Sequence, residues 1–348
     1  MLVVDNISLK AGTFELTNIT FTVDQGDYFV ILGISGVGKS LLLESIAGLI
    51  KINSGNIYLR GKNISEEKIQ KRNISIVYQD TDLFPHLTVF ENIAYPLRSK
   101  REKDIEEKVL KTAELVGVSD KLSRKPDTLS GGEYQRVALA RSLAADNDIF
   151  LLDEPLSSLD AKSKRELRAL LRKLNRSGIT IIHVTHDYEE AVSLAGKIGI
   201  MEKGNLVHVA TPENIFKHPK SEFVAQFIGI KNFLPGKLKS LPQSDLKEFI
   251  VNETRLFCLT EADDGDAFLL IQPEEISISN SAESGSARNH FEGEIIDIAR
   301  AKIGVEVTVD IGCEVVALIS AESMNSLGLK IGNRIWTNFK ASACRIYN

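Results

Sequence analysis

One short glycine-rich segment constrains the fold of this chain more than any other. Residues 33–40 read Gly-Ile-Ser-Gly-Val-Gly-Lys-Ser, which matches the pattern G-x-x-x-x-G-K-[ST] in full. The segment follows the apolar run Tyr28–Leu32 and precedes another that begins at Leu41, as expected for a strand, a tight loop and a helix. Glycines let successive backbone N–H groups turn inward around an anion, and the N-terminus of the following helix adds partial positive charge. The segment therefore predicts a phosphate-binding loop.

The side chains of this loop predict how a nucleoside triphosphate is held. The ammonium group of Lys39 can reach the β- and γ-phosphates, and the hydroxyl of Ser40 can ligate Mg²⁺. ATP and Mg²⁺ are therefore the expected cofactors. The other loop residues expected to contact the nucleotide are Gly33, Ser35, Gly36 and Gly38.

A pair of carboxylates follows a second apolar run. Residues 149–152 are apolar throughout, as in a parallel strand covered on both faces, and Asp153 and Glu154 come directly after them. Such a pair can simply cap the next helix. However, ligands bind at the carboxyl ends of strands in sheets of this kind, and a phosphate loop is already present. We expect Asp153 to hold Mg²⁺ and Glu154 to activate the attacking water.

The first 230 residues alternate strand-like and helical patterns, which predicts an α/β fold with a largely parallel sheet. Strands are expected at Leu2–Leu9, Phe14–Val23, Tyr28–Leu32, Ile74–Tyr78, Ile149–Leu152, Thr180–Val184, Ile198–Met201 and Leu206–Ala210. Between about residues 88 and 145 the pattern is helical, most clearly at Glu106–Val116 and Gly132–Ala145. We interpret this stretch as a helical subdomain within an ATPase domain of residues 1–230.

The string Leu129-Ser130-Gly131-Gly132-Glu133-Tyr134-Gln135-Arg136 carries a family resemblance. It is similar to the signature motif of the ABC-type ATPases, and the phosphate loop, this string and the carboxylate pair occur in the order and spacing of that family. The resemblance covers about residues 2 to 229 and implies a P-loop ABC-type nucleotide-binding domain. It also implies a homodimer in which Ser130, Gly131 and Gly132, at a helix N-terminus, contact the nucleotide held by the opposite protomer.

Further residues take their expected roles from the same resemblance. Gln79 resembles the glutamine that senses Mg²⁺ and the attacking water, so it is both a catalytic and a metal-site candidate. His186 resembles the catalytic histidine that touches the γ-phosphate. The family usually stacks adenine on an aromatic side chain near the start of the chain. Residues 11–13 offer none, and Phe14 is the nearest aromatic residue.

Other segments resemble those of importers. Phe84–Ile93 resembles the permease-contacting segment, which implies integral membrane permease subunits as partners and, indirectly, an extracytoplasmic substrate-binding protein. No run approaches the roughly 18 apolar residues of a spanning helix. We therefore expect a peripheral protein on the cytoplasmic face of the cell membrane. The alternative class is a non-transport regulatory ABC ATPase, which co-purification with a multi-spanning membrane protein would exclude.

After about residue 231 the pattern changes to short alternating runs separated by Gly, Asn and Asp. This change predicts a small β-barrel or sandwich over residues 231–348. Strands are expected at Ala267–Ile271, Glu294–Ile298, Glu306–Asp310, Val315–Ile319 and Arg334–Thr337.

Part of this tail resembles the molybdate-binding module of molybdate and tungstate proteins. The segments that carry the resemblance are residues 286–289, 293–295, 327–332 and 339–343. It implies an OB-like regulatory barrel. A tetrahedral oxyanion needs hydroxyls, amides and one or two cations, and we nominate Ser286, Arg288, Lys340 and Ser342. The alternative is a barrel without a ligand that only stabilises the dimer.

These inferences predict an ATP-hydrolysing subunit that energises import of molybdate or tungstate and is inhibited when its tail binds the accumulated oxyanion. A sugar, phosphate or ferric ion importer is the alternative for the cargo. The net charge of −5, with no long run of one sign, gives no footprint of a nucleic-acid binder, so no nucleic-acid partner is expected. Cys258, Cys313 and Cys344 lack metal-ligand spacing and are expected to be small buried residues.

Overall fold

The chain forms two compact units, residues 1–217 and 218–348. The computed structural model describes residues 1–79, 83–217, 219, 221–281 and 285–347, apart from the side chains of residues 217, 222 and 226. The sequence places the domain boundary between residues 230 and 231. The structure divides earlier because α8 (Glu222–Phe227) packs against the first strand of the tail, β11 (Asn232–Ser240).

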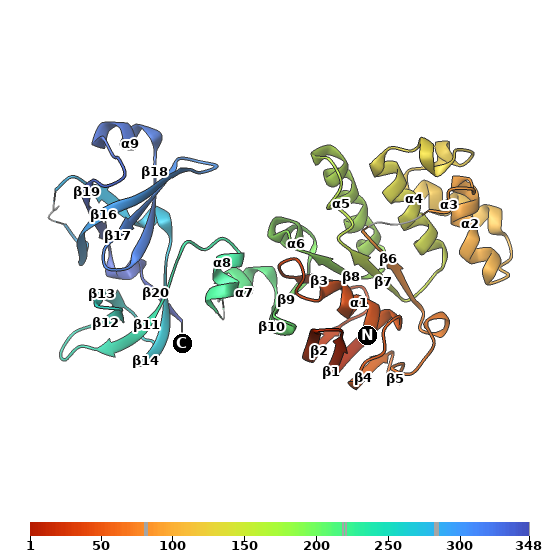
Figure 1. Ribbon diagram of the computed structural model, residues 1–348, viewed down its shortest axis with the longest axis horizontal. Coiled ribbons are helices and arrows are strands. Elements are labelled where there is room, and N and C mark those ends of the chain that lie inside the picture. Colours follow the sequence, from red (N-terminus) through yellow and green to blue (C-terminus); the bar gives the residue numbers. More distant parts are fainter. Residues whose placement is uncertain (80–82, 218, 220, 282–284, 348) are drawn as a thin grey trace. The chain divides into compact units, whose positions relative to one another are not determined.

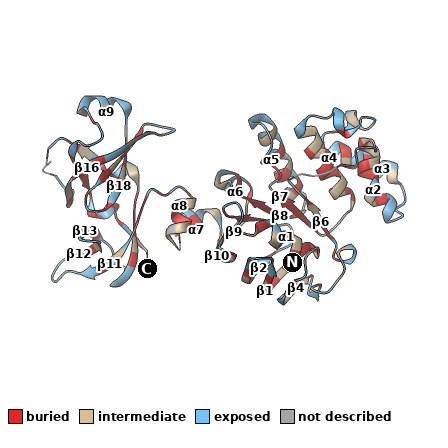
Figure 2. Ribbon diagram, in the orientation of Figure 1, coloured by how far each residue is buried: buried red, intermediate tan, exposed pale blue. Residues whose placement is uncertain are grey.

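A largely parallel sheet forms the centre of the first unit (Figure 1). Its strand order is β10-β9-β3-β8-β7-β6. The strands β9, β3, β8, β7 and β6 run parallel to one another, and β10 pairs antiparallel with β9 at one edge. The parallel strands are buried along nearly all of their length (Figure 2), because helices and the second sheet cover both faces. The strands are β3 (Tyr28–Leu32), β6 (Ile74–Val77), β7 (Ile149–Asp153), β8 (Thr180–Thr185), β9 (Lys197–Glu202) and β10 (Asn205–Ala210).

A second, antiparallel sheet has the order β2-β1-β4-β5. Its strands are β1 (Leu2–Ala11), β2 (Phe14–Val23), β4 (Ser54–Leu59) and β5 (Lys62–Asn63). Phe21 of β2 stacks on Phe29 of β3 with ring centroids 4.8 Å apart and planes 6° from parallel. Both sheets contribute to one buried apolar cluster, so their relative position is fixed by core packing.

Three helices form the inserted group: α2 (Val89–Ser99), α3 (Ile105–Val116) and α4 (Gly131–Ala144). Each packs against the other two. Both α2 and α4 begin with a capping box, made by Thr88 with Glu91 and by Ser130 with Glu133. These three helices lie within residues 88–145, the stretch where the sequence predicts a helical subdomain.

The remaining helices are shorter or lie on the sheet faces. The α-helices are α1 (Lys39–Ala47), α5 (Ala161–Arg176), α6 (Tyr188–Leu194), α7 (Pro212–Lys217) and, in the tail, α9 (Ala321–Leu327). Single turns of 3₁₀-helix occur at Ile69–Lys71, Ser119–Lys121, Pro126–Thr128, Pro273–Glu275 and Ala341–Ala343.

The tail unit consists of two five-stranded antiparallel sheets around one shared apolar core. The first sheet has the order β13-β12-β11-β14-β20 and the second β15-β19-β16-β17-β18. The strands not yet bounded are β12 (Leu246–Val251), β13 (Thr254–Leu259), β14 (Gly265–Ile271), β15 (Ser277–Ser279), β16 (Asn289–Arg300), β17 (Val305–Asp310), β18 (Glu314–Ile319), β19 (Arg334–Phe339) and β20 (Arg345–Tyr347). The expected α/β domain followed by a small all-β domain is confirmed.

Two fully buried asparagines connect the tail sheets. Asn232 of β11 accepts from Val316 N at 2.6 Å and donates to Val316 O at 2.8 Å. Asn289 of β16 bonds the backbone N and O of Phe257 at 2.7 and 2.9 Å. Each amide is therefore satisfied by the backbone of the opposite sheet, as a buried polar group requires.

Glycine or proline interrupts two of the strands that the sequence did not predict: β4 contains Gly55, and β11 contains Pro235 and Gly236. The other unpredicted strands, β5, β12, β13, β15 and β20, contain neither residue. β11 contains Pro235, which is tolerated in a central strand because β12 pairs only with residues 237–240 of β11.

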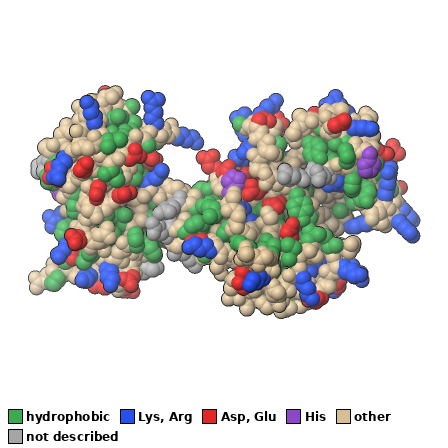
Figure 3. Space-filling model, viewed as in Figure 1, with side chains coloured by type: hydrophobic (Ala, Val, Ile, Leu, Met, Phe, Trp, Pro, Cys, Tyr) green, Lys and Arg blue, Asp and Glu red, His purple; other side chains and the backbone are tan. Residues whose placement is uncertain are grey.

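Basic and acidic side chains are interspersed on the face of the molecule shown in Figure 3. Among the described residues, no helix has the length and hydropathy needed to cross a membrane.

All three cysteines are buried, as expected. Burial raises the pKa of the Cys313 thiol to about 11.

Candidate functional site

The phosphate loop lies between the carboxyl end of β3 and the start of α1, where the motif predicted it. Gly33 has no room for a side chain, since a Cβ atom there would lie 2.8 Å from Met201 O on β9. Gly38 has a φ of 99°, and a Cβ atom there would lie 2.5 Å from Cε1 of Phe14. The loop is therefore held tightly between the two sheets, and its backbone stays open to a ligand on the other side.

Lys39 is the first residue of α1 and is only 5% exposed. Its ammonium group donates to Gly33 O at 2.8 Å and to Ile34 O at 3.0 Å, and it lies 3.7 Å from Glu154 Oε1. Burial lowers the pKa of Lys39, and the nearby carboxylate of Glu154 opposes that shift. The cation is thus aligned along the loop by neutral carbonyls, with one carboxylate nearby.

Asp153 ends β7 and lies beside Ser40 of α1. Its carboxyl is 7% exposed, and burial raises its pKa, while a hydrogen bond from the Ser40 hydroxyl opposes the shift. A hydroxyl beside one carboxylate is the protein share of a Mg²⁺ site that is completed by phosphate oxygens and water. The described residues contain no group of three or more His, Cys, Asp or Glu side chains placed to hold a metal alone. The donor set therefore fits a magnesium–nucleotide complex.

Glu154 has an unusual backbone conformation for a residue with a side chain, with a φ of 44°. Hydrogen bonds hold it there: its N–H donates to Val184 O at 3.0 Å, and its carbonyl accepts from Ser157 Oγ at 2.9 Å. The carboxylate lies 3.0 Å from Nδ1 of His186, measured at Oε2. Strained conformations of this kind persist at functional sites, where the surroundings fix a side chain in one direction.

The sheet brings the separate sequence motifs together around one cavity of about 660 Å³. Gln79 follows β6, Glu154 follows β7 and His186 follows β8, so three neighbouring parallel strands each deliver one candidate. Lining residues from the predicted set are Ser35, Gly36, Gly38, Lys39, Ser40, Gln79, Glu154 and His186. Phe14, which is half-buried, also lines this cavity.

The signature residues are outside this cavity. Ser130 is the N-cap of α4, and its Oγ accepts from Glu133 N at 3.4 Å. Ser130 and Gly131 are both exposed, and neither they nor Gly132 line the cavity. The start of α4 is therefore exposed in the single chain and lies outside the cavity that is lined by its own phosphate loop.

Three of the four nominated tail residues line a second cavity, of about 450 Å³. Ser286, Lys340 and Ser342 lie on its wall, whereas Arg288 is exposed and is not among the described lining residues. The sequence analysis did not find Glu275, Ser277, His290 and Asn338, which also line it. His290 and Asn338 are a cross-strand pair of β16 and β19, and only the strand register brings them together.

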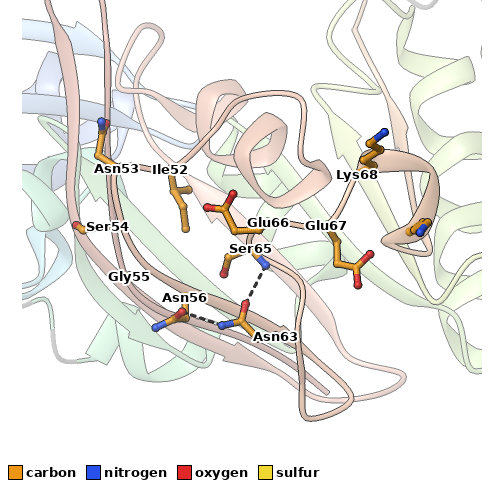
Figure 4. A pocket seen from close by; sticks show the side chains of 11 residues that line it. Ile52, Asn53, Ser54, Gly55, Asn56, Asn63, Ser65, Glu66, Glu67 and Lys68 are labelled. Carbon is orange, nitrogen blue, oxygen red and sulfur yellow. Dashed lines mark hydrogen bonds between the residues drawn. The ribbon is translucent and has the colours of Figure 1, made fainter.

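A third hollow, of about 490 Å³, lies beside the β4–β5 hairpin. Asn63 donates to Asn56 Oδ1 at 2.8 Å and accepts from Ser65 N at 2.9 Å (Figure 4). These polar groups satisfy one another, and Glu66 pairs with Lys51 at the surface. We assign no role to this hollow.

A parallel sheet with a phosphate loop, a buried lysine and a carboxylate pair at its carboxyl edge defines a P-loop nucleotide-binding domain. Two family models match the chain: one described as ABC transporter matches residues 16–157, and one described as TOBE domain matches residues 285–346.

Curated relatives match over most or all of the chain. Over the full length of both proteins the chain is 40% identical to the molybdate/tungstate import ATP-binding protein WtpC of Pyrococcus horikoshii. It is 39% identical to the spermidine/putrescine import ATP-binding protein PotA of Thermotoga maritima, over 83% of this chain and 81% of that one.

Two solved structures share the fold of the first unit. CbiO1 of Clostridium perfringens, part of the ABC transporter complex CbiONQ, has a TM-score of 0.58 at 28% identity, covering 62% of this chain and 90% of that one. A dimeric ATP-binding cassette with ADP and phosphate bound, in a post-hydrolysis state, has a TM-score of 0.55 at 30% identity, covering 61% and 99%.

The chain belongs to the ABC transporter family, as an ATP-binding subunit of its import systems. Its ATP hydrolysis is coupled to import.

The raised pKa of Asp153 leads to a stability prediction. Because the folded state disfavours the ionised carboxylate, the free energy of unfolding falls as the pH rises through that raised pKa. Asp153→Asn keeps the shape and removes the charge. Without nucleotide, the variant should be more stable than wild type at neutral pH, and the difference should shrink as the pH falls toward about 4. Urea unfolding across this pH range measures the difference in the free energy of unfolding between the two proteins. An Asp153→Asn variant that is less stable than wild type at neutral pH would contradict a raised pKa of Asp153.

Proposed function

We propose that this chain energises the uptake of molybdate or tungstate, as a homodimer on the cytoplasmic face of a membrane permease. The observation that carries the cargo assignment is the full-length match to molybdate/tungstate import proteins, at 40% and 37% identity for two Pyrococcus species. The tail cavity, with Ser286, Lys340 and Ser342 on its wall, adds chemical support, because hydroxyls and an ammonium group suit a tetrahedral oxyanion.

The match to spermidine/putrescine import proteins names a second cargo class, of opposite charge. A polyamine site needs several carboxylates or aromatic faces around the cation. Among its described residues the tail cavity offers one carboxylate, Glu275, beside the ammonium of Lys340 and several hydroxyls. This wall favours an anion.

The catalytic roles follow from the groups around the nucleotide cavity. Glu154 is positioned to take a proton from the attacking water, and His186, 3.0 Å from its carboxylate, orients it. Lys39 neutralises charge on the transferred phosphate. Ser40, Asp153 and Gln79 are the groups that would hold Mg²⁺, which when bound neutralises the triphosphate. Phe14, the nearest aromatic residue and part of the cavity wall, is our candidate for contact with the base.

The exposure of Ser130 and Gly131 supports a site that two chains share. Ser130 and Gly131 are exposed at the N-terminus of α4, and neither they nor Gly132 line the cavity at the phosphate loop of their own chain. In a homodimer the same surface can close over the γ-phosphate held by the other chain. Closure of two such sites moves the permease, which contacts the segment that includes Phe84–Ile93, and hydrolysis reopens the dimer. A substrate-binding protein outside the membrane delivers the cargo.

The tail provides feedback in this proposal. Oxyanion bound in the tail cavity favours a dimer with separated ATPase units, so import falls when the cell is replete. Such coupling is reciprocal, so ATP-driven closure and oxyanion binding weaken each other by the same factor.

Loss of the Glu154 carboxylate should stop turnover without stopping binding. Glu154→Gln keeps the size of the side chain but removes the proton acceptor, so ATP turnover should fall at least about a hundredfold while ATP affinity is retained. Steady-state hydrolysis and nucleotide titration measure the two effects. Glu66→Gln, which changes an exposed carboxylate at the third hollow, is the matched control and should leave turnover unchanged. Undiminished turnover in Glu154→Gln would remove Glu154 from this role.

The two capping boxes allow a matched test of the shared site. Ser130→Ala and Thr88→Ala each remove a helix N-cap with the same geometry, at a cost of about 1 kcal/mol in stability. We expect only Ser130→Ala to lower ATP turnover, by at least about tenfold, because it also removes a hydroxyl that contacts the nucleotide of the partner chain. Equal turnover in the two variants would argue against a composite site.

The tail cavity should select oxyanions. Calorimetry of the full chain with molybdate, tungstate, sulfate and maltose should show binding of the first two. Lys340→Gln removes the ammonium from the cavity wall and should weaken tungstate binding at least about tenfold, as loss of a charge-assisted contact does. Arg288→Gln, at an exposed residue outside the wall, should have a smaller effect. Binding of maltose in place of the oxyanions would support the sugar alternative.

A further inference from the structure

The charges on the wall of the tail cavity nearly cancel. Among its described lining residues, the cationic side chain is Lys340 and the anionic one is Glu275. These two opposite charges offset each other, so the hydroxyl groups on the wall can bind an anion but the two charges add little to its attraction. The remaining titratable group on the wall is His290, so its protonation decides whether the cavity is positive.

A chain of hydrogen bonds around His290 has a definite direction. The hydroxyl of Ser279 donates to Ser281 O at 2.8 Å, so it can only accept from the neighbouring amide of Asn338, whose Nδ2 lies at 3.0 Å. The amide orientation then turns Oδ1 of Asn338 toward Nδ1 of His290, at 2.8 Å. On the other side of the ring, Nε2 of His290 lies 2.7 Å from Ala287 O. Both ring nitrogens therefore face oxygen acceptors.

Only the imidazolium form satisfies this arrangement. A neutral imidazole carries one N–H, so it leaves one of the two oxygens without a donor. Turning the amide of Asn338 over does not remove the conflict. The single hydrogen of the Ser279 hydroxyl would then face two carbonyl oxygens and could bond only one. Asn338 is 4% exposed and Ser279 is 7% exposed, so a lost bond here is not readily replaced by water.

We propose that His290 is a proton-dependent cation of the tail cavity, and that a tetrahedral oxyanion binds there together with a proton. This inference rests on the proposed oxyanion site. His290 does not donate to the anion, because both of its nitrogens are already bonded to protein oxygens. It acts by charge alone, which distinguishes it from Lys340 and from the hydroxyls of Ser286 and Ser342.

The neighbouring charged groups set the sign of this effect. Two charged side chains share the wall with the ring: Glu275 comes from the 3₁₀ turn before β15, and Lys340 follows the end of β19. On β16 itself, Glu292 is exposed and lies 3.9 Å from Arg334. Arg288, before β16, is exposed. A bound dianion adds negative charge beside the ring, so binding favours protonation and oxyanion affinity must rise as the pH falls.

The test is calorimetry of the full chain with tungstate at pH values from about 6 to 8, in pairs of buffers with different ionisation enthalpies. For wild type we expect uptake of up to one proton per anion, and an affinity for tungstate that falls by up to about tenfold per pH unit as the pH rises. His290→Gln should bind more weakly at low pH and should show neither proton uptake nor the pH dependence. Glu275→Gln is the matched control: it should bind more tightly than wild type while affinity still falls as the pH rises.

The outcomes separate this inference from the proposed function. Tungstate binding that is equally strong at all pH values, or a His290→Gln variant with unchanged pH dependence, overturns the role of His290 and leaves the oxyanion site standing. Absence of tungstate and molybdate binding at every pH overturns the tail site itself. Nitrogen NMR of the full chain gives a readout on unaltered protein, because imidazolium and neutral imidazole have different ring shifts. A His290 ring already neutral at about pH 6 in the presence of tungstate also overturns the inference.

Discussion

The burial of the Lys39 ammonium at the phosphate loop is the interaction on which the first unit depends. Two backbone carbonyls hold it at 2.8 and 3.0 Å, and Glu154 lies at 3.7 Å. A buried ammonium with so little compensation has a lowered pKa and is poised for a second anion. The strands β6, β7 and β8 end at the same edge of the sheet, and each is followed there by a polar side chain that lines the cavity beside Lys39.

The two cavities use the same chemistry with different scaffolds. In the first unit a helix N-terminus, a lysine and hydroxyls face the space for a triphosphate. In the tail, strands replace the helix, and a lysine, hydroxyls and an imidazole face a smaller space. Both walls also carry a carboxylate, Glu154 in one and Glu275 in the other, so neither cavity is uniformly positive.

Much of the first unit could be predicted from the sequence, because its motifs are contiguous and its buried strands are apolar throughout. The phosphate loop, Asp153 and Glu154 each follow an unbroken apolar run, so both their element and their edge of the sheet were predictable. The tail was harder. β11 carries Pro235 within its pairing region, and its pattern does not indicate a strand. His290 and Asn338 are separated by 48 positions along the chain, and only the register of β16 with β19 makes them neighbours. Arg288, nominated from its charge, is exposed.

The order of the strands also limits how the chain can change in length. Neighbouring strands lie about 4.8 Å apart, and that spacing alone sets the separation between the groups that β6, β7 and β8 deliver. One residue inserted into any of these strands would reverse the faces of all residues beyond it and move its polar group off the shared edge. Insertions and deletions can therefore be absorbed only in the connections between strands. The longest such connection, between β6 and β7, contains α2, α3 and α4, so its length can change without moving the polar groups at the sheet edge.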